Sequence, residues 1–201
     1  MHKYQNRSVA ILMIWLCALL SGCLNQHILD ITVIEKDGLV CDIKSLTPIT
    51  GIIISKNKFG IIKERSHYKN GIRHGYYTQY YPNGALKSHL NYQNGMPTGT
   101  DRLYKATGQL ILQYRYEKKR LTIESYYQNG KIDTVEIYVN GLLDGKYIRY
   151  FDNGQVEVLA SYKEGRLNGL IKSYNKNGKI LSENNYLNGK IVHYTFWKPQ
   201  V

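Results

Sequence analysis

Residues 68–84 read Tyr-Lys-Asn-Gly-Ile-Arg-His-Gly-Tyr-Tyr-Thr-Gln-Tyr-Tyr-Pro-Asn-Gly, and this stretch decides the fold. It contains two Asn-Gly dipeptides, whose backbones readily accept the positive φ angles of tight hairpin turns. The residues between the two dipeptides suffice for a strand and carry no helix caps. The stretch therefore predicts a strand with a hairpin connection at each end.

The same pattern recurs along the chain about every two dozen residues. A first column of tyrosines keeps this spacing at every step but one, which is two residues shorter: Tyr68, Tyr92, Tyr116, Tyr138, Tyr162 and Tyr186. A second column follows a dozen residues later in all units but one: Tyr80, Tyr104, Tyr126, Tyr150 and Tyr174. Glycines mark the turns in the same frame. Such self-similarity predicts tandem units, each with two hairpin connections.

Apolar residues between the turns alternate with a period of two. One aliphatic column, at Ile62, Leu86, Leu110, Ile132, Val156 and Ile180, shares its parity with the first tyrosine column, so both are expected on one face of a sheet. We predict an all-β fold, an elongated single-layer antiparallel β-meander of tandem double-hairpin repeats. The six first-column tyrosines form its structural ladder, because a half-exposed tyrosine ring buries apolar area and tolerates a hydroxyl.

The third unit departs from the pattern. Its turn reads Glu117-Lys118-Lys119-Arg120 without an Asn-Gly, and Tyr116 to Tyr126 is two residues shorter than its equivalents. We expect a kink or a change of loop type there. Lys118, Lys119 and Arg120 are candidate binding residues for an anionic partner, and the alternative is a decayed repeat with a solvated run of charge.

Residues 1–22 have the plan of a signal peptide, with Lys3 and Arg7 before an uncharged run from Val9 to Leu20. That run of a dozen residues spans only ~18 Å, less than a ~30 Å hydrocarbon core. Leu20-Ser21-Gly22-Cys23 resembles a bacterial lipobox, which implies cleavage before Cys23 and its lipidation. Leu24, which follows, implies sorting to the outer membrane, facing the periplasm. The alternative is an ordinary secretory signal.

The sequence divides into three parts: residues 1–22 as the signal peptide, 23–46 as a lipidated N-terminus with a capping hairpin around Asp37-Gly38, and 47–201 as the repeat domain. Phe196, Trp197 and Pro199 are expected to close the last edge of the sheet. Cys41 is expected to be a small buried hydrophobe, because no histidine is placed by sequence to activate it.

Composition and charge bound the function. The chain has 201 residues, a length that excludes a large multidomain enzyme. Its 19 tyrosines and 18 glycines are the excess expected of a tyrosine-glycine repeat. The net charge is +12, and without Lys3 and Arg7 it is +10, which favours acidic partners or anionic surfaces. The exported address argues against nucleic acid as the partner. No P-loop, dinucleotide motif or metal-ligand spacing occurs, so we predict no catalytic activity, no cofactor and no metal.

The repeated units resemble the bacterial variant of the MORN repeat over roughly Thr47 to Trp197. The resemblance implies scaffold, lipid-associated or dimerisation roles and brings no catalytic residues with it; the family frequently carries an antitoxin label. We therefore expect a membrane-anchored, non-catalytic repeat scaffold that binds a protein or an anionic envelope polymer. The alternative function is an immunity protein or antitoxin that neutralises a toxin in the periplasm.

Overall fold

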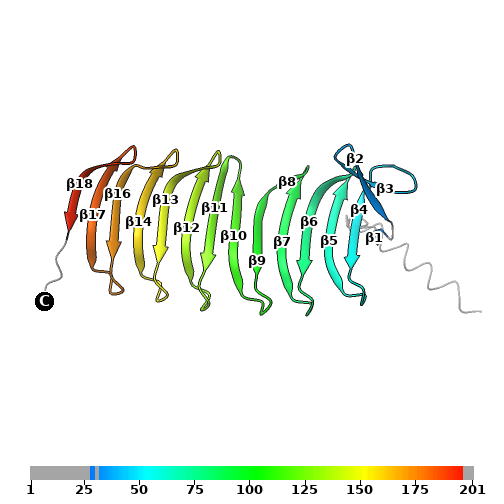
Figure 1. Ribbon diagram of the computed structural model, residues 1–201, viewed down its shortest axis with the longest axis horizontal. Helices are drawn as coiled ribbons and strands as arrows, with labels where there is room; N and C mark the ends of the chain where they lie inside the picture. Colours follow the sequence, from blue (N-terminus) through cyan, green and yellow to red (C-terminus); the bar gives the residue numbers. More distant parts are fainter. Residues whose placement is uncertain (1–27, 30–31, 197–201) are drawn as a thin grey trace, which may run out of the picture.

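The computed structural model describes residues 28–29 and 32–196, which form one long, single row of strands (Figure 1). Sixteen strands belong to one sheet and two form a separate hairpin. The strands are β1 (Ile28–Leu29), β2 (Val33–Lys36), β3 (Leu39–Asp42), β4 (Gly51–Lys56), β5 (Ile62–Lys69), β6 (Ile72–Tyr80), β7 (Leu86–Gln93), β8 (Met96–Pro97), β9 (Gly99–Tyr104), β10 (Leu110–Glu117), β11 (Arg120–Tyr126), β12 (Ile132–Val139), β13 (Leu142–Tyr150), β14 (Val156–Lys163), β15 (Arg166–Leu167), β16 (Gly169–Tyr174), β17 (Ile180–Leu187) and β18 (Lys190–Phe196).

The prediction of an elongated antiparallel meander is confirmed. From β4 to β18 each long strand pairs antiparallel with the next along the chain, and no helix occurs among the described residues. Large side chains are rarely buried, since only Tyr77 among the aromatics of this region falls below a tenth exposed. The sheet therefore has no second layer, and its stability comes from contacts between neighbouring units.

The two hairpin connections of each unit have different geometry. After each first-column tyrosine the chain makes a two-residue turn. In every unit but the third, both turn residues have positive φ, as at Asn70-Gly71 (52° and 76°). That combination is the type I′ pattern, whose twist matches that of the strands. The other connection is a five-residue loop such as residues 81–85, where only Gly84 has positive φ. There the asparagine side chain accepts a backbone bond instead, from Ala85 N–H to Asn83 Oδ1 at 3.1 Å.

The short third unit is explained by a missing bulge. Between β5 and β6, one residue separates Ser66 from Tyr68 while three separate their partners Tyr77 and Arg73, so β6 carries two extra residues. The same excess occurs between β12 and β13. The pairing of β10 with β11 has no register shift at all. The two residues missing from the sequence are thus those of the bulge, and the expected kink does not interrupt the sheet.

Cross-strand register assigns every paired side chain to a face, because residues opposite each other point the same way. All six first-column tyrosines lie on one face, which we call the tyrosine face. One of its rows runs through Ser55, Glu64, Gln79, Ser88, Leu103, Leu112, Ser125, Thr134, Arg149, Val158, Ser173 and Ser182. The row on the other face, the opposite face, runs through Ile54, Arg65, Thr78, His89, Arg102, Gln113, Glu124, Val135, Ile148, Leu159, Lys172, Glu183 and Thr195.

The N-terminal hairpin forms around Asp37-Gly38 and lies against the first repeat, beside its two-residue turn. The hairpin of β2 and β3 does not pair with the first edge strand, β4, which instead pairs in parallel with β1. The hairpin lies against the turn at Gly71, where Val40 N–H donates to Gly71 O at 2.9 Å. It covers the end of the first turn, because a Cβ on Gly71 would lie 2.9 Å from Leu39 Cβ.

At the other end, β18 is the last strand of the sheet that the structure describes. The predicted closure of this edge by Phe196, Trp197 and Pro199 depends on side chains that lie outside the described part of the chain.

Candidate interaction surfaces

The tyrosine ladder pairs with the glycines of the preceding unit. Tyr68 lies opposite Gly51, Tyr92 opposite Gly75, Tyr116 opposite Gly99, Tyr162 opposite Gly145 and Tyr186 opposite Gly169; Tyr138 faces Leu121 in the unit that lacks the glycine. A glycine opposite a tyrosine leaves its ring unobstructed on the shared face. The ladder is thus built from tyrosine-glycine pairs, which the spacing of the two columns could have revealed.

The best-formed part of the tyrosine face surrounds Tyr77, which is 8% exposed. Its hydroxyl donates to Glu64 Oε2 at 2.8 Å and accepts from Gln79 Nε2 at 2.6 Å. The guanidinium of Arg73 lies over the Tyr77 ring, 4.8 Å from its centre, and 5.6 Å from that of Tyr92. Burial, followed by the bond to Glu64, raises the pKa of Tyr77 to about 12. The polar groups of this cluster therefore bind one another within the sheet.

Several other tyrosine hydroxyls also have protein partners. Tyr126 donates to Glu124 and Tyr138 to Glu136, both at 2.7 Å, while Tyr127 donates to the carbonyl of Tyr150 at 2.6 Å. Burial and the bond to Glu124 raise the pKa of Tyr126 to about 12. Tyrosine in place of phenylalanine thus supplies hydrogen bonds within the sheet. Its hydroxyl is more than a group that can remain exposed to solvent.

Asp101 occupies the centre of the tyrosine face, where it is 3% exposed. Its Oδ1 accepts from Asn91 N–H at 2.8 Å, and the Tyr116 hydroxyl bonds to the carboxyl group. Burial raises the pKa of Asp101, and these two bonds offset part of that rise. The equivalent positions carry Tyr77, Ile123 and Tyr147, so the periodic pattern offered no signal for this acid.

We expect the Asp101→Asn variant to be more stable, relative to the wild type, at pH 7 than at about pH 3. A raised carboxyl pKa in the folded state means that the stability this group contributes is present below the unfolded pKa and is lost as pH rises through the folded pKa. The substituted amide cannot ionise and escapes that loss. Urea unfolding at both pH values measures the difference.

Asp152→Asn is the control of opposite sign. Lys176 lowers the pKa of Asp152, so this carboxylate contributes stability above its unfolded pKa that is lost as pH falls. The Asp152 variant should therefore lose stability at pH 7 and match the wild type near pH 3. An Asp101 variant whose difference from the wild type is unchanged by pH contradicts the argument.

The basic residues Lys118, Lys119 and Arg120 all lie exposed at the two-residue turn between β10 and β11. Only Lys118 has positive φ, 54°, whereas the Asn-Gly turns place both residues there. At four other turns the glycine N–H donates to a carbonyl earlier in the chain, as Gly95 does to Arg73 O at 2.8 Å, and at the turn of Gly141 the donor is Asn140 N–H, to Lys119 O at 3.1 Å. No such bond is described for Lys119 N–H among residues 32–196. The turn type thus changes, as expected, and the turn lacks the backbone hydrogen bond that the glycine N–H donates in those four turns.

Replacing Lys118-Lys119 by Asn-Gly is expected to stabilise the protein by about 1 kcal/mol, because lysine in the left-handed region costs ~1 kcal/mol that Asn-Gly largely avoids. Thermal and urea unfolding measure this change. The reverse exchange, Asn140-Gly141 to Lys-Lys, places lysines at φ 51° and 80° and should destabilise by a similar or larger amount. If both exchanges leave stability unchanged, the left-handed backbone conformation of these turns does not contribute to the stability of the protein.

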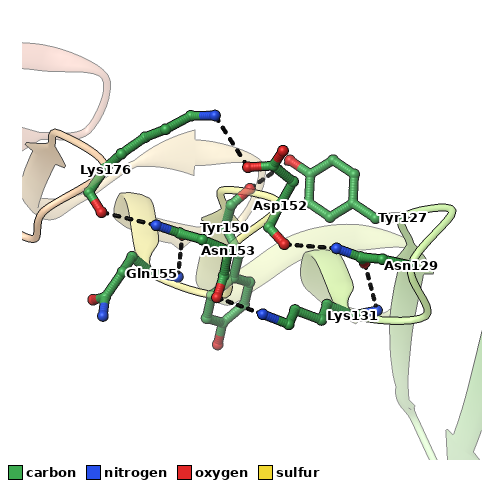
Figure 2. A network of polar contacts seen from close by, with 8 residues as sticks. All are labelled: Tyr127, Asn129, Lys131, Tyr150, Asp152, Asn153, Gln155 and Lys176. Carbon is green, nitrogen blue, oxygen red and sulfur yellow. Dashed lines mark hydrogen bonds and ion pairs between the residues drawn. The ribbon is translucent and has the colours of Figure 1, made fainter.

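The five-residue loops are joined to one another by side chains along their edge of the sheet (Figure 2). Asn129 Nδ2 donates to Asp152 O at 2.7 Å, and Asn153 Nδ2 donates to Lys176 O at 2.9 Å, each reaching the loop one unit later. Lys131 Nζ donates to Asn153 O at 2.7 Å, and Lys176 Nζ contacts Asp152 at 3.1 Å. These asparagines join each loop to the loop of the next unit, so the Asn-Gly loops help to hold neighbouring units together.

The residues that could act in catalysis or bind a metal do not lie together in the described part of the chain. Cys41 is 3% exposed and free, as expected for a small buried hydrophobe. Among the residues the structure describes, no group of three histidines, cysteines or carboxylates could hold a metal ion. Nor do these residues include a helix of the length and apolarity that crossing a bilayer requires. Cys23 lies outside the described residues.

Comparison with known proteins places this fold in a class. The architecture is that of a tandem-repeat β-meander, and residues 73–94, 143–164 and 167–188 match the family described as MORN repeat variant. Each matched segment spans a five-residue loop with its two flanking strands. The resemblance noted from the sequence is thus supported at three units.

Similarity to other proteins goes little further. None of the curated proteins matches this chain. Among solved structures, a substitution mutant of S. aureus TarM in complex with Fondaparinux, alpha-GlcNAc-glycerol and UDP is 18% identical, with a TM-score of 0.35, covering 46% of this chain and 19% of that one. A second TarM structure is also 18% identical, with a TM-score of 0.36, covering 48% and 20%. This chain therefore spans about a fifth of the length of these structures.

Proposed function

We propose that this protein is a non-catalytic repeat scaffold, held at a membrane, that binds another protein. The observation that carries the proposal is the uninterrupted sheet, in which cross-strand rows continue from β4 to β18. Such a sheet presents two extended faces whose positions are set by the repeat, as in other repeat proteins that bind partners over long surfaces.

The engagement of the carboxylates supports a role without catalysis. Glu64, Glu124 and Glu136 accept bonds from tyrosine hydroxyls, and Glu157 and Glu183 form ion pairs with Arg149 and Lys172 at 2.9 and 2.8 Å. A general acid or base needs an open approach to its substrate, and these groups are occupied by partners within the sheet.

Membrane attachment is proposed through Cys23, on the lipobox resemblance. Only Leu24 to His27 separate Cys23 from β1, which begins at Ile28, so the sheet would begin close to an anchored cysteine. More than one acyl chain gives stable membrane binding, because each buried methylene contributes ~0.8 kcal/mol.

Labelling cells with a palmitate analogue tests the anchor. We expect label on the wild type and its loss in Cys23→Ala, with the protein released from the outer-membrane fraction. A labelled Cys23→Ala protein, or a wild type without label that is soluble in the periplasm, contradicts lipidation at Cys23 and favours an ordinary secretory signal.

Lys118, Lys119 and Arg120 are proposed as one contact for an anionic partner. Changing them to Asn, Gly and Gln should weaken partner binding in low salt while stability is retained or raised, for the reason given for this turn. Equal binding by the variant and the wild type rejects the contact.

Cross-linking in intact cells, followed by mass spectrometry, tests the scaffold function. A reproducibly captured envelope protein supports it. A captured toxin, together with rescue of cells from that toxin, would instead establish the immunity function. Capture of an envelope polymer without any protein contradicts the proposed class of partner.

A further inference from the structure

One half of the opposite face carries an excess of positive charge. Within β5 and β9 this face presents Arg65, Lys69 and Arg102, which we call the basic face. Register places no aspartate or glutamate on the opposite face from β5 to β9, and Asp101 points to the tyrosine face. The cations of the basic face are therefore not neutralised by their own surface.

The cations lie at fixed spacing on the sheet. Arg65, Thr78, His89 and Arg102 follow one another in a single cross-strand row. Strands are ~4.8 Å apart, so the two arginines in this row lie ~14 Å apart at their backbones. Lys69 lies at the end of β5 next to the two-residue turn, on the same face as Arg65. The paired strands therefore hold the cations at fixed backbone positions.

An exposed aromatic ring lies within this arrangement. Tyr76 is 52% exposed, and its ring lies 4.9 Å from that of His89 and 6.4 Å, edge-on, from that of His67. Two imidazoles therefore hold the tyrosine from both sides, so that little conformational entropy remains to be lost on binding. Tyrosine and arginine are the residue types most enriched among those that dominate binding energy at protein interfaces.

The other half of the opposite face differs, although the repeat is the same. Its central row carries the apolar Val135, Ile148 and Leu159, and then the paired charges Lys172 and Glu183. The basic face is thus a feature of particular units and no consequence of the repeat pattern. Residues that the scaffold does not require are free to serve recognition.

We propose that the basic face, with Tyr76 at its centre, is the docking surface for an acidic face of a partner protein. The inference rests on the proposed scaffold function and names its surface. A linear polyanion needs only mobile cations along a track, whereas an exposed tyrosine held between two histidines suits a folded partner with a complementary apolar contact. Charge complementarity should speed association, and the tyrosine should slow dissociation.

Photo-crosslinking of the full-length protein in cells tests the surface. The photoreactive residue p-benzoylphenylalanine replaces Tyr76, and matched variants carry it at Leu170 of the same face, Phe59 at the five-residue loops or Met96 at the two-residue turns; these side chains are 43%, 75% and 73% exposed. We expect capture of an acidic protein at position 76 and none at 170. Capture only at 59, 96 or 170 overturns the docking surface and leaves the scaffold function standing. No captured protein at any position overturns both.

Binding of the captured protein, purified, to charge variants completes the test. Arg65 and Lys69 are exposed and have no side-chain partner among the described residues, as is true of the control pair Lys146 and Lys179. We expect Arg65→Glu with Lys69→Glu to lower the association rate constant roughly tenfold in low salt, and Tyr76→Ala to raise the dissociation rate constant roughly tenfold. Lys146→Glu with Lys179→Glu should change either rate by less than about twofold at ~0.15 M salt.

The two pairs carry the same change in net charge, so they separate local contact from overall attraction. Equal effects of the two pairs overturn the proposal, as does unchanged dissociation of the Tyr76 variant. Binding of dextran sulfate that depends on Arg65 and Lys69, together with no protein captured at position 76, also overturns it in favour of a polymeric ligand.

Discussion

Tyr77→Ala is expected to lower the free energy of unfolding by about 3 kcal/mol, within the range for removal of a large buried aromatic side chain. Tyr77 is 8% exposed, and its hydroxyl joins Glu64 to Gln79 while its ring lies under Arg73. The variant would leave a void in the tyrosine face and three polar side chains without this partner. Urea unfolding of the full-length protein measures the loss.

The neighbouring residue supplies a matched control. Tyr76 has the same side chain and adjoins Tyr77 in β6, but points to the opposite face and is 52% exposed. Tyr76→Ala should therefore cost less than about 1 kcal/mol. Tyr77→Phe, which keeps the ring, should cost about 1 kcal/mol through its lost hydrogen bonds. Equal losses at positions 76 and 77 would show that neither face dominates stability.

Gly145→Ala is expected to cost about 3 kcal/mol, for two reasons that act together. Gly145 has φ 126°, a conformation that essentially only glycine adopts and that costs other residues 1 to ~3 kcal/mol. An added Cβ would also lie 3.3 Å from Cβ and Cγ2 of Ile137 on the preceding strand. Because this position forms the bulge of β13, relief would require movement of the paired backbone.

Gly141→Ala separates the two causes. Gly141 also has positive φ, 80°, but an added Cβ there would meet nothing within 4 Å. Only the conformational cost applies, about 1 to 2 kcal/mol. Thermal unfolding of both variants compares them directly. If Gly141→Ala is as damaging as Gly145→Ala, the close approach to Ile137 contributes nothing and the bulge is more adaptable than the structure indicates.

Turn chemistry and periodicity were enough to predict the fold. They failed at one column, because Ile62 was expected on the face of Tyr68 and a bulge at the start of β5 pairs it instead with Lys56 of the opposite face. Elsewhere, an Asn-Gly pair every two dozen residues limits each segment to a strand, and side chains alternate along it. Both properties are local, so they can be read without knowing the tertiary structure. Three of the sixteen strands of the sheet follow from details that periodicity does not reveal, because Thr98 and Asn168 each divide a segment that reads as continuous and β1 adds to the edge.

The candidate surfaces could be predicted only in part. The basic turn at Lys118 was visible because a run of charge is contiguous in sequence. Arg65, Lys69 and Arg102 lie far apart in the sequence on two strands, and only register shows that they share a surface. The same is true of the bond from Tyr77 to Glu64, which lies on the neighbouring strand.

The amino-acid sequence by itself determined the antiparallel meander, the length of its units and the tyrosine ladder, because turn propensity and side-chain alternation act between near neighbours. Tertiary structure decided which tyrosines are buried, where the N-terminal hairpin lies and how cations from separate units combine beside Tyr76. These features depend on cross-strand register, and a two-residue bulge such as that at Gly75 resets the register without leaving a mark in the alternation of any one strand.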